Sequence, residues 1–198
     1  MPLTVDELLA AHPWPAEYAQ ASRLEWLWHF DVAMPLDAVW PLVADTSRMN
    51  RAMGTTRFHF EDRGNERWGR SVQGGVQHEW REVPWNWVVG QHIESVRVYE
   101  RGFMRVVYGL FTFERLDAEK TRVNVYFGVV PRSWWGRAAV KLGLPSLEKD
   151  FRRVFDDVAA QYAAVKRAQM PVPPAEPLAP DAKSRLDAAS AKLKADGF

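Results

Sequence analysis

The sequence of 198 residues contains no cysteine. Disulfide bonds, thiolate metal sites and cysteine nucleophiles are therefore excluded, which suits a reducing compartment. Residues 1–21 lack the basic segment and apolar run of a secretory signal. No stretch approaches the roughly 18 apolar residues of a membrane-spanning helix. We therefore expect a cytoplasmic protein.

A strong excess of charge of one sign is also missing. The chain has 26 Lys and Arg residues against 25 Asp and Glu residues, for a formal net charge of +1. This balance provides no field that would attract nucleic acid, and we expect no nucleic-acid partner.

Motifs of several enzyme classes are missing as well: there is no GxSxG, no P-loop and no GxGxxG after a strand. His92 and Glu94 lie on the same side of a predicted strand, but a metal site needs further convergent ligands. No HExxH motif is present. We expect neither a metal ion nor a cofactor, and the sequence alone does not identify an enzyme.

An apolar stripe at helical spacing is the clearest pattern that the sequence does contain. It runs through residues 146–166 and consists of Leu147, Phe151, Val154, Phe155, Val158, Tyr162 and Val165. A stripe this broad needs a partner surface. Because the residues before it read as strands, we expect the helix to lie across a curved antiparallel sheet, with a cavity between the two.

The alternation of apolar and polar residues predicts six strands. The first, Leu24–Val32, is followed by two short helices, of which the second ends near Met53. Gly74 and Gly75 suggest a bulge or a sharp bend within one long strand, as a strongly curved sheet requires. The other five strands are predicted at Thr56–Asp62, Arg67–Val83, Trp87–Tyr99, Phe103–Arg115 and Thr121–Val130.

Further segments flank this predicted domain of residues 23–170. Thr4 and Glu7 have the spacing of a helix capping box, so residues 1–22 are predicted to form a helical arm outside the sheet. Five prolines make residues 171–180 a stiff extended linker. Residues 181–198 are predicted as a helix that begins a neighbouring module or binds a partner.

The order of strand, two short helices, meander and long helix resembles the START-like (SRPBCC, polyketide cyclase-like) helix-grip superfamily. The phrases FDVAMPLDAVWPLVAD and RLDAEKTRVNVYF are similar to its opening strand and helix and to its last hairpin. The resemblance implies an α+β helix-grip fold, in which about six antiparallel strands wrap around a long C-terminal helix. It implies an internal cavity and transfers no catalytic residue.

A narrower resemblance covers WREVPWNWVVGQ, the proline-rich linker and RLDAASAKLKADGF. Their order is similar to that in the amino-terminal START-like module of bacterial class III adenylate cyclases. This resemblance implies a regulatory or sensory role.

Strand alternation predicts which side chains face the cavity. An acidic or phosphate head group would suit the arginines among them, whereas pairing with surface carboxylates is the alternative. The predicted ligand-binding residues are Arg70, His78, Trp80, Gln91, Arg105, Phe111, Phe113, Phe127, Phe151 and Phe155. The adjacent Trp134 and Trp135 suit a lid over the cavity or a membrane interface, and an edge of the core is the alternative.

Three functions remain open at this point. The first is binding of a hydrophobic or amphipathic small molecule, with a regulatory link to a neighbouring domain. The second is a cyclase- or dehydratase-type enzyme that uses His78 with an arginine as oxyanion partner, although His78 equally suits a hydrogen-bonded core position. The third is an interaction protein whose own aromatic side chains fill the cavity.

Overall fold

The computed structural model describes residues 3–45, 49, 52–53, 58–73 and 75–169. The chain divides after Tyr162 into two compact units. In the second unit only residues 163–169 are described, and they are helical. The sheet and the sites discussed below all belong to the first unit.

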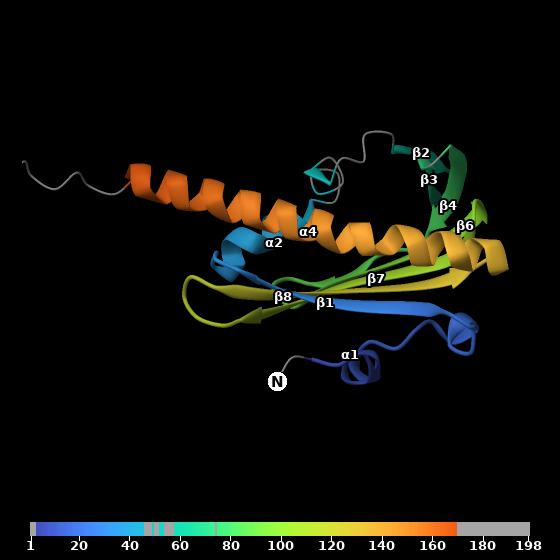
Figure 1. The fold of residues 1–198 in the computed structure, drawn as a ribbon, viewed down its shortest axis with the longest axis horizontal. Helices are drawn as coiled ribbons and strands as arrows, with labels where there is room; N and C mark the ends of the chain where they lie inside the picture. Colours follow the sequence, from blue (N-terminus) through green and yellow to red (C-terminus); the bar gives the residue numbers. More distant parts are fainter. Residues whose placement is uncertain (1–2, 46–48, 50–51, 54–57, 74, 170–198) are drawn as a thin grey trace, which may run out of the picture. The chain divides into compact units, whose positions relative to one another are not determined.

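An antiparallel sheet forms the centre of the first unit (Figure 1). Its strand order is β1-β8-β7-β6-β4-β3-β2, and the short β5 pairs with β6. The first and last strands are therefore neighbours, as a helix-grip sheet requires. The eight strands are β1 Leu24–Val32, β2 His59–Arg63, β3 Glu66–Gln73, β4 Val76–Glu82, β5 Asn86–Val88, β6 His92–Arg101, β7 Met104–Arg115 and β8 Thr121–Pro131.

The long helix α4 spans Trp134–Gln169, and its part within the first unit, residues 134–162, lies across one face of this sheet (Figure 1), here called the inner face. Phe151, Val154 and Phe155 are each 2% exposed and pack against aromatic side chains of β1. The rings of Phe30 and Phe155 are 5.3 Å apart. The predicted α+β helix-grip fold is confirmed, and the predicted stripe is correct except at its end, where Val165 is 56% exposed.

The N-terminal arm packs on the opposite, outer face of the sheet (Figure 1). Its helix α1, Val5–Ala11, begins with the predicted capping box, in which Thr4 and Glu7 each accept a hydrogen bond from the other's backbone N–H. A short 3-10 turn, η1 Ala16–Tyr18, follows. Leu8 and Trp14 are buried, and the Trp14 indole N–H donates to the Tyr126 hydroxyl at 2.8 Å.

Of the two short helices predicted after β1, the first is α2, Leu36–Ala44. The second falls largely outside the described residues. Met49 and Met53 within it are described, and the Met53 N–H donates to the Met49 carbonyl oxygen, as in a helical turn. The predicted linker, residues 171–180, and the predicted helix, residues 181–198, also lie outside the described residues. Within the described part of the chain, no helix is both long and apolar enough to cross a membrane.

The predicted strand Arg67–Val83 is two strands, so a single strand with a bulge was wrong, whereas the alternative expectation of a sharp bend at this glycine pair agrees with the hairpin. Gln73 pairs with Val76, and the chain reverses between them, with Gly75 at φ +78°. Across this hairpin an odd-numbered residue lies opposite an even-numbered one. Even-numbered residues therefore face inward on β4 and outward on β3.

Two further local features change the direction of side chains. The predicted strand Trp87–Tyr99 is divided into β5 and β6 by a turn that contains Gly90 at φ +73°. In β7 the register shifts between Met104 and Val106, which leaves Arg105 as the extra residue of a β-bulge. The turns at Gly75 and Gly90 each divide one predicted strand into two, which explains why the sheet has eight strands where the sequence predicted six.

We predict that Phe155→Ala lowers the free energy of unfolding by about 3–5 kcal/mol, because it leaves a void beneath α4. Val165→Ala, on an exposed part of the same helix, is the control and should change it by less than about 0.5 kcal/mol. Urea titration followed by circular dichroism measures both changes. Equal effects of the two substitutions would show that the stripe does not hold the helix on the sheet.

Candidate functional site

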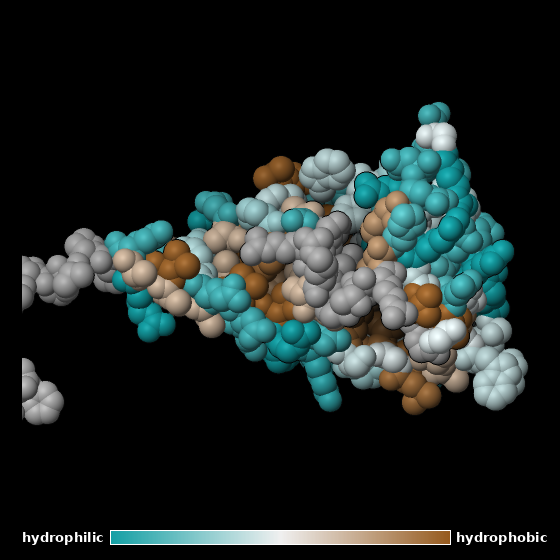
Figure 2. All heavy atoms as spheres, turned by 90° about the horizontal axis from the view of Figure 1, so that it is seen from above, coloured by the Kyte–Doolittle hydropathy of each residue, from teal (hydrophilic) through white to brown (hydrophobic). Residues whose placement is uncertain are grey.

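A cavity of about 650 Å³ lies between α4 and the inner face of the sheet. This volume falls in the range of small-molecule sites, which is about 300–1,000 Å³. On the face of the molecule seen in Figure 2, hydrophobic atoms show in several places between hydrophilic ones. Most of the lining is apolar, and it includes Val43, Met49, Met53, Phe58, Trp85, Ile93, Phe103, Val107, Phe111, Phe127, Val129, Val140, Leu144, Leu147 and Phe151.

The polar side chains that the sheet contributes to the lining come from one strand. Ser95, Arg97 and Tyr99 alternate along β6 and therefore share its inner side with Ile93. The helix contributes Ser146 and Asp150. A ligand in this cavity would meet polar groups at a few defined places and carbon elsewhere.

A buried carboxylate holds Arg97 in position. Glu82 lies directly opposite Arg97 on the neighbouring strand β4, and Arg97 Nε donates to Glu82 Oε1 at 3.2 Å. The Glu82 side chain is only 7% exposed, and it also accepts from the Trp80 indole N–H at 3.4 Å. The guanidinium carbon of Arg97 stands 5.3 Å from the centre of the Trp80 ring. These contacts orient a cation at the cavity wall.

The lining contains two uncharged groups that can donate hydrogen bonds, the Tyr99 hydroxyl and the Trp85 indole N–H. Burial raises the pKa of Tyr99, with the nearby Arg97 partly opposing this shift, so the phenol is protonated at neutral pH. The indole N–H of Trp85 is buried and has no hydrogen-bond partner among the described residues. A buried donor without an acceptor costs about 1–3 kcal/mol, and an acceptor on a ligand would remove that cost.

Solved structures of other proteins have a similar fold. The ZhuI aromatase/cyclase from Streptomyces sp. R1128 superimposes with a TM-score of 0.59 at 14% identity, covering 72% of this chain and 96% of that one. Norcoclaurine synthase from Thalictrum flavum gives 0.53 at 8% identity, covering 73% and 98%. The di-domain aromatase/cyclase StfQ of the steffimycin pathway gives 0.55 at 13% identity, covering 72% and 52%.

The chain has the helix-grip fold. No family model and no curated protein sequence matches it, so the similarity lies in structure rather than in sequence. At these identities the superpositions establish the fold alone. The resemblance to the adenylate cyclase module stays a prediction.

The helix-grip fold brings part of the predicted residue set to the cavity. Phe111, Phe127 and Phe151 line it. Phe113 and Phe155 pack in the core beside it, Phe113 against Trp40 with ring centres 5.1 Å apart. Trp80 is fully buried in an aromatic cluster on the inner face, with Phe58, Phe60 and Tyr99 around it.

Of the four polar residues that were expected to face inward, three do not. Gln91 is exposed in the turn between β5 and β6, and Arg105 is exposed at the bulge of β7. Arg70 is exposed because it lies on β3, where even-numbered residues face outward, whereas on β4 they face inward. The inward orientation predicted for these residues was wrong, and Arg97 is the arginine at the cavity.

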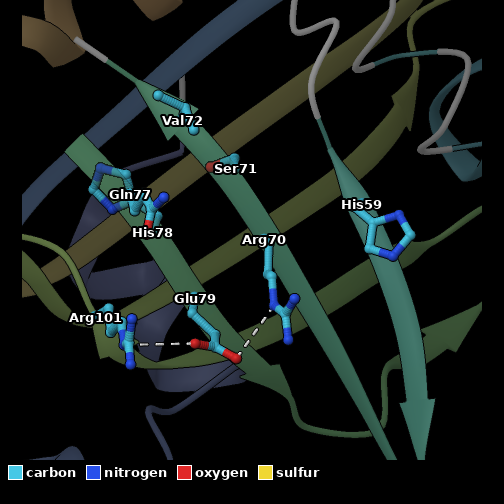
Figure 3. A pocket seen from close by; sticks show the side chains of 8 residues that line it. All are labelled: His59, Arg70, Ser71, Val72, Gln77, His78, Glu79 and Arg101. Atoms are coloured by element: carbon cyan, nitrogen blue, oxygen red, sulfur yellow. Dashed lines mark hydrogen bonds and ion pairs between the residues drawn. The ribbon is translucent and has the colours of Figure 1, made fainter. Parts of the chain in front are cut away.

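Arg70 instead belongs to a second, charged pocket of about 520 Å³ near the end of the β3–β4 hairpin (Figure 3). Figure 3 shows Arg70 and Arg101 on either side of Glu79, at N–O distances of 3.4 and 3.7 Å. Arg63 also donates to Glu79, and this hydrogen bond is the main cause of the lowered pKa of Glu79. Pairing with carboxylates was the alternative interpretation of Arg70.

His78 is buried and lies outside the lining of the apolar cavity. Its ring stands edge-on to the Phe103 ring, with centres 4.5 Å apart, and it lies tightly against Gly102. Neither ring nitrogen has a hydrogen-bond partner among the described residues. Burial lowers the pKa of His78, so the imidazole is neutral at neutral pH.

Trp134 and Trp135 are 68% and 67% exposed at the start of α4. Their rings stack on one another, with centres 3.9 Å apart. The buried-edge alternative is therefore wrong for this pair. Because Ala139 and Val140 on the next turn of α4 line the cavity, the pair lies near its rim.

Glu82, Ser95, Tyr99 and Trp85 were not predicted as site residues. The alternation Ile93-Ser95-Arg97-Tyr99 is visible in the sequence and identifies the inner side of β6 once the turn at Gly90 is placed correctly. No comparable signal existed for Glu82, since its position depends on the register between β4 and β6.

We predict that His78 makes the protein less stable at mildly acidic pH. Its pKa in the folded state lies below the ordinary value of 6.5, so below that pH the unfolded chain binds a proton that the folded chain does not. The free energy of unfolding contributed by this residue is thus present above pH 6.5 and is lost as the pH falls towards the folded-state pKa.

Urea titrations between pH 5 and pH 8 measure this dependence, as the difference between the wild type and His78→Phe. The exposed His59 provides the control substitution, His59→Asn. A difference between wild type and His78→Phe that does not change with pH would contradict the prediction.

Proposed function

We propose that this START-like domain binds a hydrophobic or amphipathic small molecule in the cavity beneath α4. The observation that carries the proposal is an apolar cavity of about 650 Å³ whose few polar groups are oriented by buried partners. Apolar area contributes most of the affinity in such a site, and polar groups determine the orientation. The third sequence hypothesis, a cavity filled by its own aromatic side chains, finds no support in this volume.

The polar groups favour a ligand with one polar end. Arg97 and the Tyr99 phenol together suit a carboxylate, a phenolate or a carbonyl oxygen, since both donate hydrogen bonds. Trp85 offers a further donor on the lining. A molecule with an apolar body and an acceptor at one end therefore fits better than a pure hydrocarbon.

Cyclase- or dehydratase-type chemistry is the alternative function. It is supported by two structural neighbours, ZhuI and StfQ, which are aromatase/cyclases. Tyr99 and Arg97 are better placed than His78 to touch a substrate, since both line the cavity. Chromatography with mass spectrometry of a copurified ligand distinguishes the functions: a ligand unchanged in retention time and mass after incubation indicates binding, and a new species that Tyr99→Phe abolishes indicates catalysis.

The resemblance to adenylate cyclase modules suggests that ligand binding is signalled to a neighbouring domain through residues 181–198. Trp134 and Trp135 are proposed as a lid at the cavity rim, with membrane contact as the second option. Flotation of the protein with liposomes separates these roles for the pair, because only membrane contact moves the wild type to the lipid fraction.

We predict that Ala139→Trp lowers the affinity for anilinonaphthalene sulfonate, an amphipathic anionic probe, by about tenfold or more. Ala139 lines the cavity and is exposed, so an indole there blocks the site without disturbing the core. Ala138→Trp is the matched control, because Ala138 is also exposed on α4 and lies outside the lining. Fluorescence titration measures both affinities.

The control should bind the probe as the wild type does. Equal affinities of all three proteins would mean that the probe binds elsewhere on the surface. Absence of probe binding by the wild type, together with failure to extract any ligand from the purified protein, would overturn the proposed function.

A further inference from the structure

On the outer face of the sheet, three potential metal ligands converge away from the cavity. They are His12 at the end of α1, and His92 and Glu94 on β6, and their ligand atoms all lie within 4.8 Å of one another. Glu94 Oε1 is 2.5 Å from His12 Nδ1 and 3.7 Å from His92 Nε2. We infer that these residues form a binding site for a divalent transition-metal ion of the Zn²⁺ type.

The fold explains why these residues meet. His92 and Glu94 are two positions apart on a strand and so point to the same side of the sheet, opposite to Ile93 and Ser95 in the cavity lining. His12 is delivered by the arm, whose Leu8 and Trp14 are buried against the outer face. The sequence predicted no metal because the third ligand lies 80 positions before His92.

The donor set matches what Zn²⁺ selects. Imidazole nitrogen and carboxylate oxygen bind Zn²⁺ at about 2.0–2.2 Å, so two ligands of a tetrahedral site stand roughly 3.3 Å apart. The observed separations of 2.5 and 3.7 Å lie on both sides of that value. Small side-chain rotations would open the His12–Glu94 pair and close the His92–Glu94 pair, and the metal would replace the proton between His12 and Glu94.

A hydrogen-bonded clasp between His12 and Glu94 does not account for the whole cluster. His92 Nε2 is buried and has no hydrogen-bond partner among the described residues, because its distance to Glu94 is beyond hydrogen-bonding range. A buried nitrogen lone pair without a partner is costly, and coordination would satisfy it. The side chains of the three residues are only 14–20% exposed.

Neighbouring groups already orient the ligands. Asn86 Nδ2 donates to the second carboxylate oxygen of Glu94 at 3.3 Å, which leaves Oε1 directed at the histidines. The Tyr108 hydroxyl donates to the backbone carbonyl of His12 at 3.4 Å. Such contacts raise metal affinity by holding ligands in place. Three protein ligands leave one tetrahedral position for water or another small ligand, and the bound ion would fasten the arm to the sheet.

The test uses the full chain without a polyhistidine tag, freed of metal by dialysis against a chelator. Competition with a chromophoric chelator should show one Zn²⁺ bound per chain, and Co²⁺ should give the visible absorption of a tetrahedral site. His92→Asn and, separately, His12→Asn should each weaken Zn²⁺ binding by about tenfold or more. His59→Asn, at an exposed histidine on β2, is the matched control and should bind as the wild type does.

Thermal unfolding with and without Zn²⁺ provides a second measurement. The ion should raise the melting temperature of the wild type and of His59→Asn, and should raise it much less in the two ligand variants. Circular dichroism of the metal-free variants shows whether each is folded, and the two substitutions lie on separate elements. Absence of Zn²⁺ binding by the wild type, or equal affinity in folded His92→Asn, would overturn the inference.

Discussion

The contact between α4 and the inner face of the sheet is the interaction on which the other features depend. Phe151 and Phe155 are buried against Trp28 and Phe30, and each such aromatic side chain contributes on the order of 2–3 kcal/mol by leaving water. This contact holds one part of the helix close to the sheet. Nearer the start of α4 the lining side chains stay apart, and the cavity of about 650 Å³ lies there.

The two faces of the sheet have different chemical characters because successive residues of each strand point to opposite sides. On β6, Ser95, Arg97 and Tyr99 enter the cavity, whereas His92 and Glu94 meet the N-terminal arm. One strand therefore contributes both to the proposed ligand site and to the proposed metal site. The buried Glu82 serves the first by orienting Arg97.

The general fold could be predicted because its signals are periodic over many residues. The predictions from the stripe of α4 and from the alternation in β1, β7 and β8 stay the same when the end of an element is misplaced by a residue or two. The capping box at Thr4 and Glu7 is equally local, since both partners lie within one helical turn. These features identified the helix, the order of elements and the aromatic residues Phe111, Phe127 and Phe151 in the lining.

The polar part of the site could be predicted only in part, because the face of the sheet that a side chain occupies depends on its exact position along the strand. One turn at Gly75 placed Arg70 outside, the turn at Gly90 exposed Gln91, and one extra residue in β7 exposed Arg105. A one-residue change in register moves a side chain to the other face of a sheet. Contacts between distant segments, such as Glu82 with Arg97 and His12 with Glu94, leave no local pattern in the sequence.

An electron-density map of crystals of the purified protein, measured before and after exposure to xenon gas, tests the central claim most directly. Apolar cavities of sufficient size bind xenon. The account predicts density that does not belong to the protein, either a copurified ligand or xenon, in the space bounded by Phe111, Phe127 and Phe151. A map in which protein side chains fill that space, with neither ligand nor xenon between α4 and the sheet, would contradict it.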